Sequence, residues 1–373
     1  MLVKGEEMLF ALLRASLHGR PADEKFFTGA SGSDWKVCYN TAVKQGVLAL
    51  AWDGVVTLKQ ELHPPKALKF QWGISVDKYE SKHRRYCKTA EQLQKFYKEH
   101  NIVAVQMKGV GFSANYNLPS HREGGDIDIF TYSADPEKLS HKQANELADS
   151  LMTDKGIDVD FSHSYKHSNF FYEGISIENH RCIVNIETNP KFLGHLNDVL
   201  IKYMDPYKVK LYDGEFEILV PSPQFNMLFI SCHAFQHYGS GIALHHLYDW
   251  AALVSRHGLS LPPEIKEKSY LRAIAAFSHL SNKYLGTKVD LSNLPGDYES
   301  LADEMLEEML YPKFVSYVPY TNPIRIFFYK LGRVTRNAKL SKNVLGAPIT
   351  RTIYKSLVAH LRVPSKILNR GKE

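Results

Sequence analysis

The stretch Gly-Gly-Asp-Ile-Asp-Ile-Phe at residues 124–130 constrains the fold of this chain more than any other segment. Aspartate is disfavoured in β-strands, so two aspartates that alternate with isoleucines need a reason. Side chains alternate along a strand, so Asp126 and Asp128 share one face while Ile127 and Ile129 share the other. The isoleucines predict a buried face, and the carboxylates predict a face that gathers one or two hard cations. Because Asp-x-Asp also occurs on solvent-facing strands, the surrounding sequence has to show whether these two aspartates form a functional site.

The residues before this strand favour an anion site. Residues 102–107 form a short apolar run that predicts a strand, and Lys108 and Gly109 follow it directly. Residues 109–113 can begin a short helix whose backbone amides face an anion. The sequence completes neither the G-x-x-x-x-G-K-[ST] nor the G-x-G-x-x-G phosphate motif. Strand, glycine turn, short helix and acidic strand is the order expected where nucleotide phosphates bind beside metal ions.

The chain around this motif predicts an α+β domain with a mixed or antiparallel sheet. Glu173-Gly174 and Asp213-Gly214 are typical of hairpin turns, and Gly156 is placed to end a helix. Strands are expected at 102–107, 126–132, 168–172, 175–180, 182–188, 209–212 and 215–220, and a helix at 136–155.

Helical patterns flank this domain on both sides. The chain divides into an N-terminal helical region (1–76), an α+β core (77–220), a helical domain (221–312) and a basic helical tail (313–373). The core is expected to open with a long helix at 77–100. Ser222-Pro223 supplies a cap and a first-turn proline for the helix that follows it.

The segments Met107-Lys108-Gly109, Arg122 and 125–129 together resemble the uncharacterised bacterial nucleotidyltransferases of the DNA polymerase β superfamily. In that family a strand ends in Lys-Gly, an arginine precedes the Asp-x-Asp strand, and a later strand carries Glu-x-His. Glu178-Asn179-His180 stands at that point here. The resemblance extends from about residue 34 to about residue 253. The wider superfamily carries Gly-Ser where this chain has Lys108-Gly109.

The resemblance implies a polymerase β-like core and a metal-dependent nucleotidyltransferase. Such an enzyme moves a nucleoside monophosphate from an NTP, with ATP the expected donor, to an acceptor hydroxyl of a small molecule, glycan or protein, and releases pyrophosphate. Asp126, Asp128 and Glu178 would be catalytic and would hold Mg²⁺ or Mn²⁺. The residues expected to contact the nucleotide are Lys108, Gly109, Arg122, Gly125, His180, His233 and Asp249.

The third carboxylate has more than one candidate. Glu178 and His180 share a strand face because isoleucines alternate with them at 175 and 177. Glu178 would ligate the metal or accept the proton of the acceptor hydroxyl. Glu187, on the strand expected next, and Asp160 are the alternatives.

A group of histidines follows the core. His233 and His237 are one helical turn apart, which is a spacing that can hold a metal. The glutamate of H-E-x-x-H is missing, however, since residues 234–236 read Ala-Phe-Gln. These histidines are therefore interpreted as lining a cleft or capping helices without a metal. The resemblance assigns His233 and Asp249 to the nucleotide or acceptor.

Charge leaves further functions open. The net charge is +6, yet residues 320–373 hold 12 Lys and Arg against one acidic residue. This segment is either a solvated helical surface or a contact for nucleic acid or another anionic surface. The latter would fit an RNA-modifying nucleotidyltransferase. A binding or regulatory module that keeps the fold without turnover is the other alternative.

The remaining composition is that of an ordinary soluble protein. The four cysteines are far apart in the sequence, which argues against a zinc ribbon or a disulfide framework. The N-terminus does not resemble a secretory signal, and the longest apolar stretch, 46–58, is too short to cross a bilayer. A cytoplasmic protein without a transmembrane segment is expected.

Overall fold

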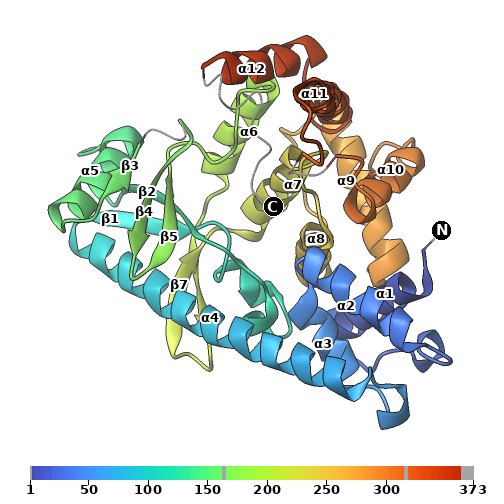
Figure 1. Ribbon diagram of the computed structural model, residues 1–373. Coiled ribbons are helices and arrows are strands. Elements are labelled where there is room, and N and C mark those ends of the chain that lie inside the picture. Colours follow the sequence, from blue (N-terminus) through green and yellow to red (C-terminus); the bar gives the residue numbers. More distant parts are fainter. Residues whose placement is uncertain (1, 162–164, 315–317, 363–373) are drawn as a thin grey trace. The chain divides into compact units, whose positions relative to one another are not determined.

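The computed structural model describes residues 2–161, 165–314 and 318–362 (Figure 1). The chain forms two compact units. The first comprises Met1–Ile183 and Leu200–Asn226, and the second comprises Val184–Val199 and Met227–Glu373.

The first unit contains the mixed sheet and the helices that precede it. Its helices are α1 (Lys4–His18), α2 (Gly32–Lys44), α3 (Leu48–Val55), α4 (Lys66–Glu99) and α5 (His141–Asp154). Its strands are β1 (Ile102–Gln106), β2 (Ile127–Ser133), β3 (Val159–Asp160), β4 (His167–Tyr172), β5 (Ile175–His180), β6 (Tyr207–Leu211) and β7 (Phe216–Val220). Short 3₁₀ helices lie at Glu24–Phe26, Gln60–Leu62, Phe112–Asn115 and Pro119–His121.

Close contacts between backbones and aromatic packing hold the first helices together. A Cβ added at Gly54 of α3 would lie 2.7 Å from the Cα atom of Leu12 in α1, so only glycine permits this approach. The buried Trp72 ring of α4 packs edge-on against Trp35 and donates a hydrogen bond from Nε1 to the Leu48 carbonyl at 2.9 Å. The N-terminal region is helical, as predicted.

Helix α4 begins at Lys66, eleven residues before the start expected from the sequence. Pro64 and Pro65 do interrupt the chain, but the helix starts immediately after them with Pro65 as its N-cap. Residues buried along α4 recur at helical spacing, from Trp72 in the N-terminal half to Leu93 and Tyr97 in the C-terminal half. One continuous apolar stripe thus joins the N-terminal helices to the sheet.

The sheet has the order β1-β2-β5-β4-β3 and is mixed, as the α+β prediction allowed. β2 and β5 run parallel, and the other neighbouring pairs are antiparallel. Glu173 and Gly174 both have positive φ, at 51° and 71°, and form the predicted turn between β4 and β5. β6 and β7 form a separate two-stranded sheet, whose turn includes the predicted Asp213-Gly214.

Two local predictions were wrong. The expected strand at 182–188 is absent, because these residues are bends and coil that pair with no strand. Its apolar residues Ile183 and Val184 are buried without a β-ladder, which shows that burial and not pairing explains the pattern. The expected helix at 136–155 begins only at His141, where Ser140 accepts a hydrogen bond from the Gln143 backbone N–H.

The two faces of the sheet differ sharply. Ile127 and Ile129 belong to a hydrophobic core that α4 and α5 supply from the same side. Residues of β6 and β7, such as Ile218, complete this core. Asp128 points to the other face, as the strand alternation predicts, and is 2% exposed.

The second unit is helical among its described residues. It contains α8 (Leu244–His257), α9 (Lys268–Leu280), the π-helix η5 (Ser281–Leu285), α10 (Glu299–Leu310), α11 (Pro323–Leu345) and α12 (Ile349–Arg362). Helices α6 (Pro190–Lys202) and α7 (Pro223–Gln236) each include the residues at which the chain passes between the units.

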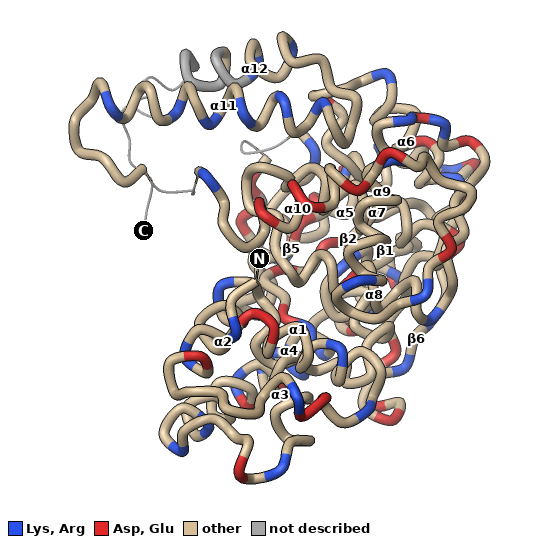
Figure 2. The backbone as a smooth tube through the Cα atoms, turned by 90° about the vertical axis from the view of Figure 1, so that its right-hand side faces the viewer, with Lys and Arg blue, Asp and Glu red and all other residues tan. Residues whose placement is uncertain are grey.

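Helices α11 and α12 carry the basic segment predicted from the sequence. Figure 2 shows Lys and Arg recurring along α11, which has no acidic residue. Arg336 of α11 pairs with the buried Glu308 of α10 at 2.6 Å, so part of this charge serves packing. Residues 363–373 lie outside the described part of the chain. Within that part, no helix is both long and apolar enough to cross a membrane.

Candidate active site

The acidic strand and the Glu-x-His strand are neighbours in the sheet. Because β2 and β5 pair in parallel, Glu178 lies opposite Asp128 and His180 lies opposite Phe130. Asp126 immediately precedes β2. Residues about 50 positions apart in the sequence therefore reach the same face at the same level of the sheet.

Asp128, Glu178 and His180 form one compact donor group. A ligand atom from each lies within 4.8 Å of the other two. His180 Nε2 lies 3.1 Å from Asp128 Oδ1 and 3.3 Å from Glu178 Oε2. Carboxylate oxygens and an imidazole nitrogen are donors that suit divalent cations.

The hydrogen bond on the far side of the His180 ring determines which nitrogen faces the acids. Nδ1 donates to the Cys182 carbonyl oxygen at 3.3 Å. The neutral ring therefore keeps its lone pair on Nε2, which faces Asp128 and Glu178. A protonated ring would donate to these carboxylates instead. Sequence reasoning expected His180 to contact the nucleotide, whereas its position also suits a metal ligand.

Lys108 supplies a positive charge among the acids. Its Nζ atom lies 3.2 Å from Asp128 Oδ2 and 3.9 Å from Asp126 Oδ1. The buried Asp128 Oδ2 atom makes no hydrogen bond of good geometry with any described residue. The Lys108 ammonium thus partly balances the negative charge of the two aspartates. Asp128 Oδ2, which is buried beside it, is an oxygen that a metal ion could bind.

The electrostatics of the group follow from this arrangement. Burial disfavours the charged form of Lys108, but Asp128 and Asp126 outweigh burial and raise the pKa of Lys108. Burial likewise opposes ionisation of Asp128, yet Lys108 and His180 hold its pKa well below the usual value. Burial and the neighbouring Asp128 charge raise the pKa of Asp126. Of the two aspartates, Asp128 is therefore the more acidic.

The pKa of Glu178 is also lowered. Burial would raise it, but the hydrogen bond and charge of His180 outweigh burial. His167 of β4 adds a second imidazole, with Nε2 3.4 Å from Glu178 Oε2. The motif did not include His167, although its place in the strand opposite His180 follows from the β4–β5 register.

A glycine turn after β1 lies beside the acidic strand. Gly109 has φ +72°, and a Cβ there would lie 3.1 Å from Gln106 Nε2 and 3.2 Å from the Asp126 carbonyl oxygen. The buried Arg122 donates from Nη1 to the Gly109 carbonyl at 3.2 Å and stacks over Phe112. Arg122 therefore shapes the turn that carries Lys108.

Two buried polar networks that sequence reasoning missed support these elements. Behind β2 and β5, Asn179 accepts from Thr131 at 2.9 Å and from Asn145 at 2.9 Å. Asn179 itself donates to Asp149 Oδ1 at 2.9 Å, and Ser168 donates to the same oxygen at 2.6 Å. This network ties α5 to the strand that carries Glu178 and His180.

The second network joins the N-terminal helices to the loop before the acidic strand. His121 Nδ1 lies 2.5 Å from Asp53 Oδ1, and His121 Nε2 lies 2.8 Å from Glu80 Oε1. Burial disfavours the imidazolium, but Asp53 and Glu80 outweigh burial and raise the pKa of His121. No spacing in the sequence links these three residues.

The other expected residues are divided between the two units. Asp160 is on β3, two strands beyond β5. Glu187, the other alternative to Glu178, belongs to the second unit and pairs with Lys355 at 2.9 Å. Gly125 leaves open space at its Cα, with nothing within 4 Å of an added Cβ. His233 and Asp249 are in the second unit, and their contact with a nucleotide remains a prediction.

Comparisons with known proteins identify a family for this chain. Residues 31–285, well over half of the chain, match the profile of a family described as "Uncharacterised nucleotidyltransferase". No curated protein matches the sequence. Among solved structures, the chain is similar to an antigenic nucleotidyltransferase-like protein from Paracoccidioides brasiliensis, with a TM-score of 0.38 and 14% identity over 56% of this chain and 95% of that chain.

Proposed function

Because the chain belongs to this family of uncharacterised nucleotidyltransferases, we propose that it transfers a nucleoside monophosphate from an NTP to an acceptor hydroxyl and releases pyrophosphate. Asp126, Asp128 and Glu178 are the catalytic acids in this proposal. The observation that carries it is the parallel β2–β5 register, which places Glu178 beside Asp128 on the face of the sheet that the core leaves free.

The donor set fits a divalent metal such as Mg²⁺ or Mn²⁺. Asp128 and Glu178 would hold it, with His180 or Asp126 as a further ligand. Asp128 Oδ2 supports this assignment because it is buried and, apart from its ion pair with Lys108, has no hydrogen bond from any described residue. A bound metal would supply Lewis-acid stabilisation of the charge that develops on the phosphates.

Lys108 acts on the triphosphate in this proposal. Its ammonium balances the charge of Asp126 and Asp128, and a cation held by these acids would take over that role. Lys108 is then available to pair with phosphate oxygens. Gly109 lets the backbone pass close to the substrate, and Arg122 holds the turn in shape.

As the alternative to ligating the metal, Glu178 would accept a proton. As the acceptor oxygen forms its bond to the α-phosphorus, the bond from phosphorus to the pyrophosphate oxygen breaks and the acceptor proton passes to Glu178. Its lowered pKa keeps the carboxylate ionised, which a proton acceptor requires, but also makes it a weak base. His233 and Asp249 would contact the nucleotide or the acceptor. ATP is the expected donor.

A labelling screen tests the proposal. The full chain is incubated with each α-labelled NTP and Mg²⁺ or Mn²⁺, and pyrophosphate release, self-labelling and NTP binding are measured. Asp128→Asn should lose metal-dependent NTP binding and all turnover. Asp135→Asn, just beyond the same strand and with its side chain 43% exposed, is the matched control and should behave as wild type.

NTP binding and turnover, measured together, separate an active transferase from a non-catalytic module. Binding of an NTP without turnover in any condition would identify a non-catalytic module. Turnover that survives Asp128→Asn would show that the acids are not the active site.

A further inference from the structure

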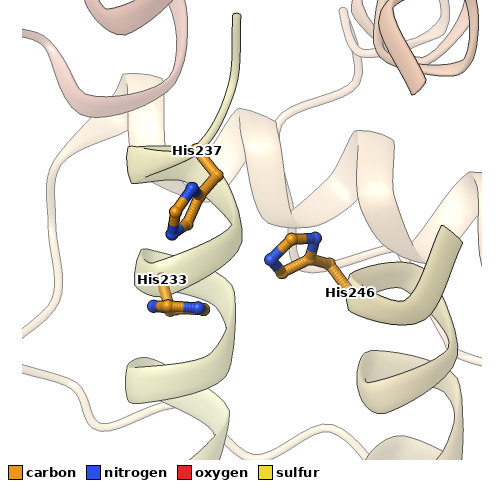
Figure 3. A group of neighbouring side chains, drawn as sticks. All are labelled: His233, His237 and His246. Carbon is orange, nitrogen blue, oxygen red and sulfur yellow. The ribbon is translucent and has the colours of Figure 1, made fainter. Parts of the chain in front are cut away.

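Three histidines from two helices meet in the second unit. His233 lies on α7, and His237 follows one turn later, because its backbone N–H still bonds to the His233 carbonyl at 3.2 Å. His246 lies in the first turn of α8. Figure 3 shows the His246 ring facing the two rings of α7 from the opposite side.

The geometry of the three rings is close to that of a metal site. A ring nitrogen from each lies within 4.8 Å of the other two. The ring centroids are 4.6 Å apart for His233 and His237, and 5.5 Å from either of them to His246. Tetrahedral zinc with bonds of about 2.0–2.1 Å needs ligand nitrogens about 3.3 Å apart. A shift of about 1.5 Å or less closes the difference, and the partly exposed rings of His233 and His237 have room to make it.

We propose that His233, His237 and His246 form a binding site for a transition-metal cation of the Zn²⁺ class, which makes His233 a metal ligand in place of the nucleotide or acceptor contact expected for it. Three imidazole nitrogens favour Zn²⁺, Co²⁺, Ni²⁺ or Cu²⁺ over Mg²⁺, which prefers oxygen ligands. The carboxylate group has the opposite preference. The chain thus carries two donor sets that differ in the metal they select.

The turn between the helices supports the third ligand. Gly239 and Gly241 have φ of +86° and +144°, conformations that side chains rarely adopt, and they let the chain reverse between α7 and α8. The buried His246 is held by a hydrogen bond from the Ala243 backbone N–H to its Nδ1 at 3.1 Å. One ring position is therefore fixed, and the other two move toward it.

The hydrogen bond from Ala243 also makes metal binding by His246 less favourable. With Nδ1 accepting, the neutral His246 ring carries its proton on Nε2, the nitrogen a metal would need. Ligation through Nε2 moves the proton to Nδ1 and breaks the bond from Ala243, which weakens binding by roughly 10- to 100-fold. Three imidazoles bind zinc tightly enough to tolerate this loss, as three-histidine zinc sites with a fourth, exchangeable water position demonstrate.

A cobalt titration of the untagged full chain tests the site. The Asp128→Asn background removes ligation at the carboxylate group, so that the result is independent of the proposed transferase activity. One equivalent of Co²⁺ should produce the visible absorption of a tetrahedral ion, Zn²⁺ should abolish it, and excess Mg²⁺ should leave it unchanged. His237→Ala should weaken Co²⁺ binding about 100-fold or more.

His257→Ala is the matched control. It removes one exposed histidine from the end of α8, outside the group, and should leave Co²⁺ affinity unchanged. Circular dichroism checks that each variant is folded, and His246→Gln provides a second, milder ligand variant.

Three results would overturn the proposal. The first is the absence of stoichiometric Co²⁺ binding by the folded chain. The second is an equal effect of His237→Ala and His257→Ala. The third is binding of inorganic triphosphate that depends on His237 while Zn²⁺ fails to bind, since this would make the group an anion site.

Discussion

Replacing Lys108 by methionine should reveal how strongly the acidic group depends on an internal cation. The substitution keeps an unbranched side chain of similar length and removes only the charge. In the wild type, the ammonium lies 3.2 Å from Asp128 and 3.9 Å from Asp126. Without it, His180 is the remaining basic partner of the buried Asp128 carboxylate among the contacts described above.

The expected loss of stability follows from these distances. At an effective dielectric constant of about 20, a charge pair at 3.2 Å attracts by about 5 kcal/mol. Burying Lys108 offsets part of this, and removal of one partner from a buried pair typically costs about 3–5 kcal/mol. We expect Lys108→Met to lower the free energy of unfolding by about 3 kcal/mol near neutral pH, because the acids can relieve part of the strain by taking up protons.

Urea unfolding followed by tryptophan fluorescence measures this loss. Three of the four tryptophans, Trp35, Trp52 and Trp72, lie in the same unit as the site, so the signal reports chiefly on that unit. Lys138→Met is the matched control, since Lys138 is 80% exposed and pairs with Asp135 at the surface. Its effect should stay within about 0.5 kcal/mol.

Metal and pH provide two further checks on Lys108→Met. Mn²⁺ should stabilise the variant more than the wild type, because no ammonium competes with it for the acids, and at 1,000 times the dissociation constant the gain is about 4 kcal/mol. The low pKa of Asp128 contributes stability above its unfolded value that is lost as pH falls, and this contribution is what the variant lacks. The difference between the proteins should therefore shrink in acid. A variant as stable as wild type and indifferent to Mn²⁺ would refute the reasoning.

Three other substitutions test the structure around the site. His121→Gln should cost about 2 kcal/mol near pH 6 and less near pH 9. The pKa of the His121 imidazolium is raised above 6.5, so its stabilisation is complete below pH 6.5 and is lost as pH rises through the pKa of the folded state. Urea unfolding at several pH values over this range measures the effect, and a loss of stability that does not depend on pH would contradict the prediction. Gly109→Ala should destabilise more than Gly174→Ala in thermal unfolding. Both glycines have φ near +70°, so alanine at either position carries a backbone cost of about 1–2 kcal/mol. Only a Cβ at position 109 would come close to other atoms. Equal effects of the two substitutions would disprove the steric argument. Asp149→Ala should cost about 3 kcal/mol, because Ser168 and Asn179 lose the buried oxygen to which they donate. Asp149→Asn keeps an acceptor oxygen and should cost less. A lower melting temperature for Asp149→Asn than for Asp149→Ala would be inconsistent with this network.

Local pattern predicted the parts of the site that one strand or turn contains. The alternation at 126–129 is enough to place both aspartates on one face, because the side-chain period of a strand is independent of its neighbours. The same holds for Glu178 and His180 on β5. Glycine at 109 was recognisable because the turn after β1 needs a residue that tolerates positive φ.

Local pattern failed where burial came from elsewhere. The apolar residues near 183 suggested a strand, but their burial arises without strand pairing. The early start of α4 was missed because its first residues, 66–71, are exposed or half-buried, and the buried stripe of the helix begins only at Trp72.

The sequence by itself determined which side chains could act: two carboxylates on one strand face, a glutamate and a histidine on another, and a histidine pair one turn apart. Tertiary structure decided which of them meet. The parallel pairing of β2 with β5 placed Glu178 beside Asp128, and the reversal between α7 and α8 brought His246 to His233 and His237. Pairing partners are chosen by the total burial and hydrogen bonding of the folded chain, and no window of the sequence contains that sum.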